Sequence, residues 1–388
     1  MGSGAGSQTT ASPEPRDDKP FHDYRSESLE YLGPAEKPIA EDLTEVAIGW
    51  FGPGDEAHSQ HGDLWAAASL AVEQANRGGG WNSLPFRLVA TWSENSWGTG
   101  VSQLARMVYE EGVWAILGSV DGAATHLAEQ VVAKALVPLV SPVATDESVN
   151  LAGVPWMFSV VPGDHLWAPV LVADLLAHLG DGDLALVSTT DHDSRAAVDV
   201  LLEELSHHDR GPLQRLDIRP QSTDLVVQLE RLRFGDVAAL LVVSGPENGA
   251  RLLRAIREQG FAGPVFGSPQ LARRACVESA GEAAQGIRVP ALSDPDVGSA
   301  ERQDFETRFR DRTSGDPDWA TAHTYDATRI LLAAIARAGL SRAAIRETLR
   351  ELSPWQGVTG TIDWDPTGQN RRPVTAMATI REGRLVVE

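Results

Sequence analysis

Two short stretches of the sequence carry side chains of the kind that bind metal ions. His58 and His61 lie three residues apart, and the segment "DHD" places two carboxylates around an imidazole at residues 191–193. Histidine and aspartate at such spacings can ligate zinc. Each stretch is also typical of a polar loop after a strand, and we adopt this interpretation. A third stretch, "SHHD" at residues 206–209, is typical of an exposed helix end. The sequence thus predicts neither a metal site nor a cofactor.

The stretch "LVPLVSPVATDESV" at residues 136–149 carries groups that bind small molecules. Its apolar start predicts a short buried strand, which Pro142 ends because proline donates no hydrogen bond to a neighbouring strand. Thr145 then offers a hydroxyl group, and Asp146 and Glu147 are typical of a first helical turn. Loops between a strand and a helix hold the ligands of many α/β proteins. Taken alone, Thr145 is better explained as the cap of that helix.

The sequence contains no motif that indicates an enzyme or a nucleotide-binding protein. The first predicted strand ends in "GWFGPGDE", with a proline and two acidic residues where a dinucleotide site needs glycines close to phosphate. The P-loop pattern Gly-x-x-x-x-Gly-Lys and the nucleophile elbow Gly-x-Ser-x-Gly are absent from the sequence. Because no nucleophile, base and orienting group emerge together, we expect no enzyme activity and no catalytic residues.

Composition limits the partners that this chain can have. Its 388 residues are 42% apolar, which is enough for two domains with cores of their own. The 33 basic and 54 acidic side chains give a net charge of −21, which repels nucleic acids and anionic membranes. The single cysteine, Cys276, excludes an internal disulfide. No apolar run approaches the roughly 18 residues that span a bilayer, so we expect no direct membrane insertion.

Residues 1–44 differ from the rest of the chain. They are rich in glycine, serine, proline and charge, with few side chains to bury, and we expect a disordered tail or linker. This part contains no positively charged segment followed by an apolar one, as a signal sequence would. Either a cytoplasmic location or the earlier removal of a signal is compatible with that observation.

After residue 44, segments typical of strands alternate with segments typical of helices. "VAIGWFGP" predicts a strand, and "LWAAASLAVEQANRGGG" predicts an amphipathic helix with a glycine stop. The same order continues to "VPLVSP", resumes at "DLALVST" and runs to "GIRVPAL". Such alternation is typical of an α/β fold, a parallel sheet with helices on both faces. Two runs of it predict two doubly wound parallel-sheet lobes with a ligand cleft between them.

Segments rich in proline and glycine mark three predicted crossings between the lobes. They are "SVVPGDH", "VPALSDPD" and "TGQNRRP". We therefore expect lobe one to comprise residues 45–163 and 292–370, and lobe two to comprise residues 164–291 and 371–388.

The eleven tryptophans have two interpretations. Trp65 and Trp114 lie in segments with apolar periodicity and should be core residues. Trp50, Trp92 and Trp97 lie at predicted strand ends or loops, where they are candidates for the wall of the cleft.

Several motifs occur in an order that resembles a known family. They are "VAIGWFGPGD", "LAVEQANRGGGWNSLPFRLV", "AILGSVDGAATHLAEQVVAKALVPLVSPVAT", "AHTYDATRILLAAIARAG" and "WQGVTGTIDWDPTGQ". From residue 46 to the C-terminus the chain resembles the type I periplasmic binding proteins, in their leucine/isoleucine/valine-binding branch. These proteins are extracytoplasmic receptors that deliver ligands to ABC importers.

The resemblance implies a ligand site. Thr145 would bind the carboxylate of an amino acid through its hydroxyl and amide groups, and the carbonyl of Val143 would accept an ammonium hydrogen. The loop at residues 121–123 would offer backbone N–H groups at the start of a helix, which is a favourable anion site. The predicted ligand-binding residues are Trp50, His61, Asp121, Gly122, Ala123, Val143, Ala144, Thr145, Asp193 and Gln270.

The chain departs from the family at the positions that face the ligand. Serines usually stand where this sequence has Asp121 and Gly122, and a tyrosine stands where it has Asp193. The family's acidic partner of the ammonium group is missing, because residues 268–270 read "SPQ". Asp193 is then the candidate ammonium partner, since Asp121 is better explained as a helix cap. We expect a polar or cationic ligand, such as an amino acid, an amino-acid derivative or an amide.

The expected function is that of a periplasmic or other extracytoplasmic solute-binding protein. Its lobes would close on a small molecule by a hinge motion and then dock on ABC permease subunits. The alternative is a ligand sensor or regulator of the same fold that takes no part in transport.

Overall fold

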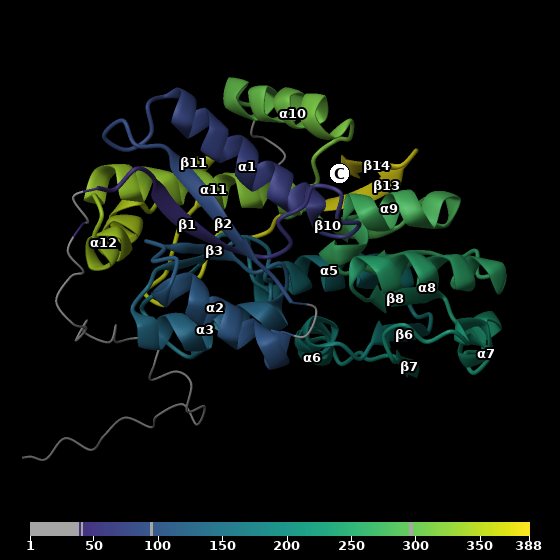
Figure 1. The fold of residues 1–388 in the computed structure, drawn as a ribbon. Coiled ribbons are helices and arrows are strands. Elements are labelled where there is room, and N and C mark those ends of the chain that lie inside the picture. The colour runs from purple at the N-terminus through teal and green to yellow at the C-terminus, as the bar shows by residue number, and fades with distance from the viewer. Residues whose placement is uncertain (1–38, 40–41, 94–95, 295–297) are drawn as a thin grey trace, which may run out of the picture.

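The computed structural model describes residues 39, 42–93, 96–294 and 298–388, which form two α/β lobes (Figure 1). Nearly all of the predicted tail, residues 1–44, lies outside the described residues. The described part contains no helix long and apolar enough to cross a membrane.

Lobe one is built on a five-stranded parallel sheet in the order β2-β1-β3-β4-β5. Its central strands are almost continuously apolar and buried, as expected where helices cover both faces of a parallel sheet. The strands are β1 (Val46–Phe51), β2 (Phe86–Thr91), β3 (Ile116–Gly118), β4 (Leu139–Ser141) and β5 (Met157–Ser159).

Helices from both halves of the sequence cover this sheet. In Figure 1 the late helices α11 and α12 lie beside the early elements of lobe one, and α11 packs along α1. The helices are α1 (Gly62–Arg77), α2 (Val101–Tyr109), α3 (Gly122–Ala135), α4 (Ser148–Leu151), α10 (Ala300–Thr313), α11 (Trp319–Ala338) and α12 (Arg342–Leu352). A π-helical turn at Ser96–Gly100 precedes α2, and the hairpin of β11 (Trp355–Gly357) and β12 (Gly360–Ile362) packs on α11.

Lobe two has a seven-stranded sheet in the order β14-β13-β10-β9-β8-β6-β7. Most of its pairs are parallel, but β13 pairs antiparallel with both β10 and β14, so the sheet is mixed at one edge. The strands are β6 (Leu184–Thr189), β7 (Gln214–Ile218), β8 (Ala239–Val243), β9 (Val265–Gly267), β10 (Arg288–Pro290), β13 (Met377–Arg381) and β14 (Arg384–Val387). Its helices include α5 (Asp164–Leu179), α6 (His192–His207), α7 (Leu225–Leu229), α8 (Pro246–Glu258) and α9 (Arg274–Ala280).

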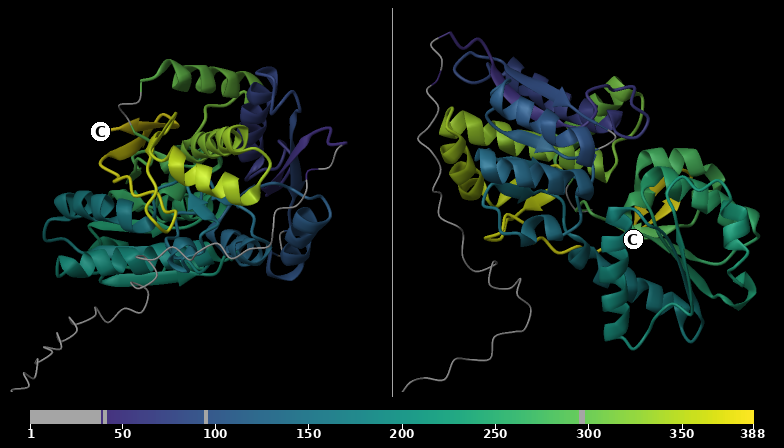
Figure 2. Two further views of the ribbon diagram at one scale, coloured as in Figure 1. Left: turned by 90° about the vertical axis from the view of Figure 1, so that its left-hand side faces the viewer. Right: turned by 60° about the horizontal axis from the view of Figure 1, so that its bottom comes forward.

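The chain passes between the two sheets three times. It does so between β5 and α5, between β10 and α10, and between β12 and β13. The right-hand view of Figure 2 shows the two lobes side by side, with the yellow C-terminal strands among the teal and green elements of lobe two. The predicted boundaries of the lobes, residue by residue, stay predictions.

The parallel strands direct their carboxyl ends toward the other lobe. The loops that follow β3, β4, β6, β8 and β9 all contribute side chains to one cavity between the lobes. This arrangement brings together residues that lie far apart in the sequence, and it defines the candidate site.

Candidate functional site

The cavity between the lobes has a volume of about 200 Å³. Lobe one lines it with residues of α1, α3, α11 and the loop after β4, and lobe two with residues of α5, α6 and the loops after β8 and β9. Of the predicted ligand-binding residues, His61, Asp121, Ala123, Val143, Thr145, Asp193 and Gln270 line this cavity.

Asp121 caps the N-terminus of α3. Its backbone is extended, and its Oδ1 accepts a hydrogen bond of 2.7 Å from the Ala124 N–H, which satisfies one of the free donors of the first turn. The sequence-based interpretation of Asp121 as a helix cap is therefore confirmed.

The Asp193 side chain extends from lobe two to the N-terminus of α3 in lobe one. Its Oδ2 accepts a hydrogen bond of 2.9 Å from the Gly122 N–H. A Cβ atom at position 122 would lie 2.6 Å from Asp193 Oδ1, which is closer than such atoms approach. Gly122 thus leaves the room that the carboxylate needs. The resemblance assigns the N–H groups of this loop to the carboxylate of a ligand. In this structure the Gly122 N–H has the Asp193 carboxylate as its partner instead.

The second oxygen of Asp193 has no such partner. Oδ1 is shut off from solvent and has no hydrogen-bond partner among the described residues. Burial raises the pKa of Asp193 to about 7, and the nearby charge of Asp121 acts in the same direction, while the hydrogen bond from Gly122 opposes both. A buried carboxylate of this kind calls for a positive or hydrogen-donating partner.

Thr145 lies on the cavity wall but is not a helix cap. The first helical residue of α4 is Ser148, and its N–H donates to Asp146 Oδ1 over 2.9 Å. The Thr145 carbonyl accepts the Asp164 N–H over 2.8 Å, so Thr145 connects lobe one to the start of α5. Burial raises the pKa of Asp164 well above its usual value, and the Thr145 side chain, which hydrogen-bonds Asp164, acts in the opposite direction.

His61 and Gln270 line the cavity from different lobes. Burial lowers the pKa of His61 to about 3, with the charges of Arg273 and His58 acting in the same direction, so the imidazole is neutral. His61 Nδ1 is buried without a hydrogen-bond partner among the described residues. Gln270 is partly exposed in the loop after β9.

Three of the predicted ligand-binding residues, Trp50, Gly122 and Ala144, are not among the residues that line the cavity. Trp50 is fully buried, its Nε1 donates to the Pro53 carbonyl over 3.0 Å, and it packs against Trp65. Ala144 is 2% exposed. Among the other candidates for the wall, Trp92 packs on Phe51, and the side chain of Trp97 lies outside the described residues.

The sequence analysis missed a buried arginine at the cleft. Arg273 in lobe two reaches into lobe one, where its Nη1 lies 2.8 Å from the Asp318 carboxylate and its Nη2 lies 3.1 Å from Asp63 Oδ1. Burial opposes its charge, but Asp318 and Asp63 outweigh burial and hold the pKa of Arg273 above its usual range. Arg273 lies immediately after the "FGSPQLA" stretch in which the ammonium partner was sought. A search one residue further would have reached it.

Two tryptophans that the sequence analysis did not single out also line the cavity. The Trp167 ring donates to Asp164 Oδ1, and the Trp319 ring of lobe one donates to the Pro269 carbonyl of lobe two over 2.9 Å. Both tryptophans belong to helices with apolar periodicity. The sequence pattern therefore does not distinguish a cavity residue from a core residue at these positions.

Known proteins resemble this chain over most of its length. A family model described as Periplasmic binding protein matches residues 45–383. An "Amino acid binding protein" of Pseudomonas aeruginosa is 26% identical over 348 residues, which cover 84% of this chain and 87% of that protein. "Leu/Ile/Val-binding protein homolog 3" of Brucella melitensis is 21% identical over 346 residues, which cover 88% of this chain and 93% of that protein.

Solved structures share the two-lobed arrangement. The substrate-binding protein LivJ of Streptococcus pneumoniae, in complex with isoleucine, has a TM-score of 0.80 and 21% identity over 89% of this chain and 99% of that one. The leucine-binding protein LivK of Thermotoga maritima has a TM-score of 0.79 and 22% identity over 88% of this chain and 97% of that one.

Proposed function

This chain belongs to the periplasmic binding protein family, and we propose that it captures one small polar molecule between its lobes for delivery to an ABC importer. The predicted family and the predicted fold class, two α/β lobes around a cleft, are confirmed. Delivery to permease subunits and an extracytoplasmic location are parts of the proposal, supported by the family.

One observation carries the proposal furthest: Asp193 Oδ1 has no hydrogen-bond partner within the part of the chain that the structure describes. A buried carboxylate oxygen without a donor is expensive in a closed protein, so a molecule that supplies the missing donor is bound favourably. Because residues of both lobes line the cavity that contains Asp193, a molecule bound there would lie between the lobes. Closure and binding are then coupled.

The same contact indicates the chemical class of the ligand. The Gly122 N–H already has the Asp193 carboxylate as its partner. A free amino acid would bring its own carboxylate close to Asp193 and Asp121, where like charges repel. An amino-acid derivative whose carboxylate is masked as an amide keeps the ammonium group for Asp193 and avoids that repulsion. We therefore favour an amino-acid amide or a related small cation over a branched-chain amino acid.

A neutral histidine provides a further polar contact. His61 lines the cavity from lobe one, and its Nδ1 has no partner among the described residues. An uncharged imidazole can both donate to and accept from an amide group. His61 and Asp193 together suit a ligand with one cationic end and one uncharged polar end.

The experiment uses matched pairs of molecules. Purified protein is denatured mildly, the released small molecules are identified by mass spectrometry, and the emptied and refolded protein is titrated calorimetrically with leucine and leucinamide, and with glutamine and glutaminamide. We expect the amide of at least one pair to bind at least about tenfold more tightly than the free acid. Tighter binding of the acid in every pair would contradict the proposed ligand class.

A further inference from the structure

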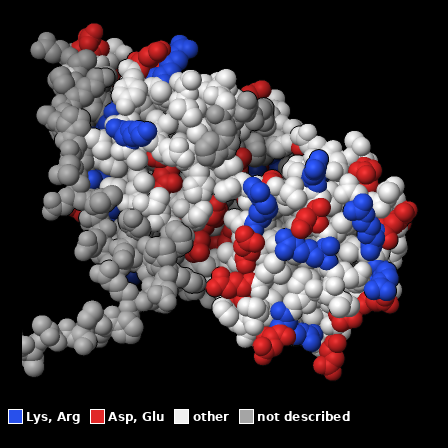
Figure 3. Space-filling view, turned by 90° about the horizontal axis from the view of Figure 1, so that it is seen from below, with Lys and Arg blue, Asp and Glu red and all other residues white. Residues whose placement is uncertain are grey.

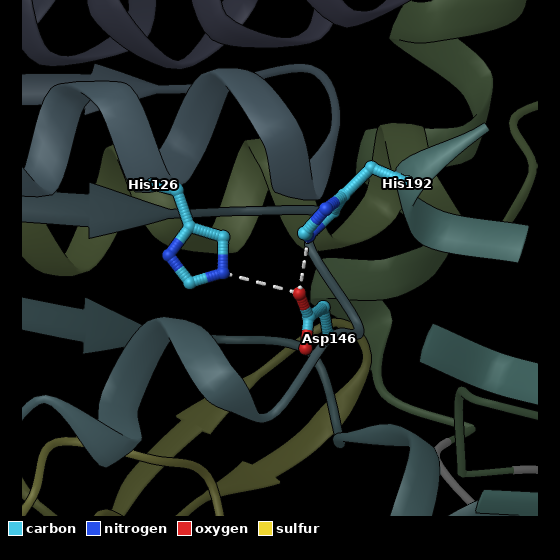
Figure 4. Close-up of side chains that lie close together, drawn as sticks. All are labelled: His126, Asp146 and His192. Carbon is cyan, nitrogen blue, oxygen red and sulfur yellow. Dashed lines mark hydrogen bonds and ion pairs between the residues drawn. The ribbon is translucent and has the colours of Figure 1, made fainter. Parts of the chain in front are cut away.

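A cluster of two histidines and an aspartate joins the lobes beside the ligand cavity (Figure 4). His126 comes from α3 and Asp146 from the loop before α4, both in lobe one, whereas His192 is the first residue of α6 in lobe two. His126 Nε2 lies 3.2 Å and His192 Nε2 lies 2.7 Å from the same atom, Asp146 Oδ2. One ligand atom from each residue lies within 4.8 Å of the other two. We refer to these three residues as the bridging cluster.

The spacing of the bridging cluster suits a small transition-metal ion. Zinc binds histidine nitrogen and carboxylate oxygen at about 2.0–2.2 Å, which puts tetrahedral ligand atoms about 3.3 Å apart. Small side-chain rotations would bring the three ligand atoms to this separation. In Figure 4 both imidazoles direct a nitrogen toward the Asp146 carboxylate.

The surroundings hold two of the three ligands in place. His126 Nδ1 lies 3.5 Å from Glu129 Oε2, and Glu129 is 4% exposed. A buried carboxylate behind a histidine fixes the ring, as outer partners in metal sites do, and directs Nε2 toward Asp146. Asp146 Oδ1 accepts the Ser148 N–H and Oδ2 accepts the Ser148 hydroxyl, both over 2.9 Å, which orients the carboxylate with Oδ2 toward the histidines. The same hydroxyl lies 2.8 Å from His126 Nε2, so a bound ion would take its place beside both atoms.

The bridging cluster is also accessible. An open cavity of about 390 Å³ is lined by Asp146, Ser148, Asp164, His192 and Asp199, among others. It offers a path for an ion and room for water at the remaining coordination positions. This cavity differs from the ligand cavity, although His192 lines both.

We propose that the bridging cluster binds one divalent transition-metal ion of the zinc class, which links the two lobes and favours their closed form. Two imidazoles and one carboxylate suit zinc, nickel, cobalt and copper, whereas calcium and magnesium prefer sites made of oxygen atoms. An ion that contacts both lobes stabilises the form in which all three ligands meet, and by reciprocity closure strengthens ion binding. The linking role rests on the proposed closure of the lobes, but the ion site does not.

The first test titrates the chelator-treated full chain with Zn²⁺ alone, by calorimetry. We expect one ion per chain, and affinity at least about tenfold weaker in His126→Gln and in His192→Gln. His207→Gln is the matched control, because His207 lies exposed at the end of α6 and outside the bridging cluster. Equal affinity in all four proteins, or no binding to the wild type, would overturn the metal site and leave a charged hydrogen-bond network only.

Two further measurements separate the site from its linking role. Co²⁺ added to the wild type should give visible absorption bands typical of bound cobalt, and His192→Gln should lose them. Small-angle scattering without any organic ligand should show a smaller radius of gyration with Zn²⁺ in the wild type and no change in His192→Gln. Zn²⁺ binding without compaction would overturn the linking role. None of these measurements depends on the proposed organic ligand.

Discussion

At the scale of single residues, the proposed ligand class depends on the contact between Asp193 and Gly122. The carboxylate reaches the start of α3 because position 122 has no side chain, and one of its buried oxygens has no hydrogen-bond partner in the described part of the chain. Asp121, another acidic residue that lines the cavity, caps the helix. The two carboxylates therefore have different roles although they lie close together.

These different roles predict which of the two substitutions weakens ligand binding more. Asp193→Asn should weaken binding of the co-purified ligand by about 1 kcal/mol or more relative to Asp121→Asn, since hydrogen bonds to charged groups are the stronger ones. Asp121→Asn is the matched control, because it makes the same change of charge and keeps a cap-forming side chain. Calorimetric titration measures both. The reverse order would place the cation on lobe one, and no effect of either change would mean that the ligand carries no positive charge.

At the scale of the elements, Asp326 connects the β11–β12 hairpin to α11. It is fully buried, its Oδ1 accepts the Val358 N–H over 2.9 Å, and its Oδ2 accepts the N–H and the hydroxyl of Thr359 over 2.9 and 2.7 Å. Gly357 lies so close that a Cβ atom there would be 2.3 Å from Asp326. One carboxylate thus holds the turn of the hairpin on the helix.

Asp326→Ala should therefore lower the free energy of unfolding by about 3 kcal/mol or more, because it leaves two buried amides without partners. Thr361→Ala, in a partly exposed hydrogen-bonded pair with Gln356 on the same hairpin, should change it by less than about 0.5 kcal/mol. Urea denaturation of both variants measures this. Similar stabilities of the two variants would show that the hairpin does not depend on Asp326.

Sequence periodicity predicted the main elements because most strands of both sheets are apolar and buried. It missed β7, an edge strand in which only Leu216 and Ile218 are buried, so that no apolar run appears. It also did not predict the antiparallel pairing of β13, which depends on where the third crossing returns the chain.

Local sequence motifs predicted part of the cavity lining. Thr145, Val143 and Asp121 follow strand ends that the sequence makes visible, and they line the cavity. The partners Asp193 and Gly122, and the trio His126, Asp146 and His192, come from different lobes and meet only in the folded chain. No spacing along the sequence encodes such meetings.

At the scale of the whole molecule, charged side chains are mixed on the surface but form buried ion pairs at the cleft. On the face drawn in Figure 3, the Arg side chains of lobe two lie among Asp and Glu side chains and do not gather into one positive patch. At the cleft, by contrast, Arg273 is 3% exposed and meets two carboxylates of the other lobe, Asp63 and Asp318. The paired charges come from different lobes and are buried where the lobes meet.

Arg273→Gln should consequently act on closure. It leaves Asp63 and Asp318 without their cationic partner in the closed form, at a cost of about 3 kcal/mol or more, whereas water solvates both carboxylates once the lobes separate. We expect ligand affinity to fall by about that amount in calorimetric titrations. Arg308→Gln removes an exposed pair with Asp304 on α10 and should leave affinity unchanged. Wild-type affinity in Arg273→Gln would show that the ion pairs do not contribute to closure.

The most direct test of the central claim is a crystal structure of the chain with the molecule that co-purifies with it. We expect that molecule in the cavity between the lobes, with a cationic or hydrogen-donating nitrogen within about 3 Å of Asp193 Oδ1 and with Asp193 Oδ2 still bound to the Gly122 N–H. A ligand carboxylate on the Gly122 N–H, with Asp193 displaced from it, would contradict the account.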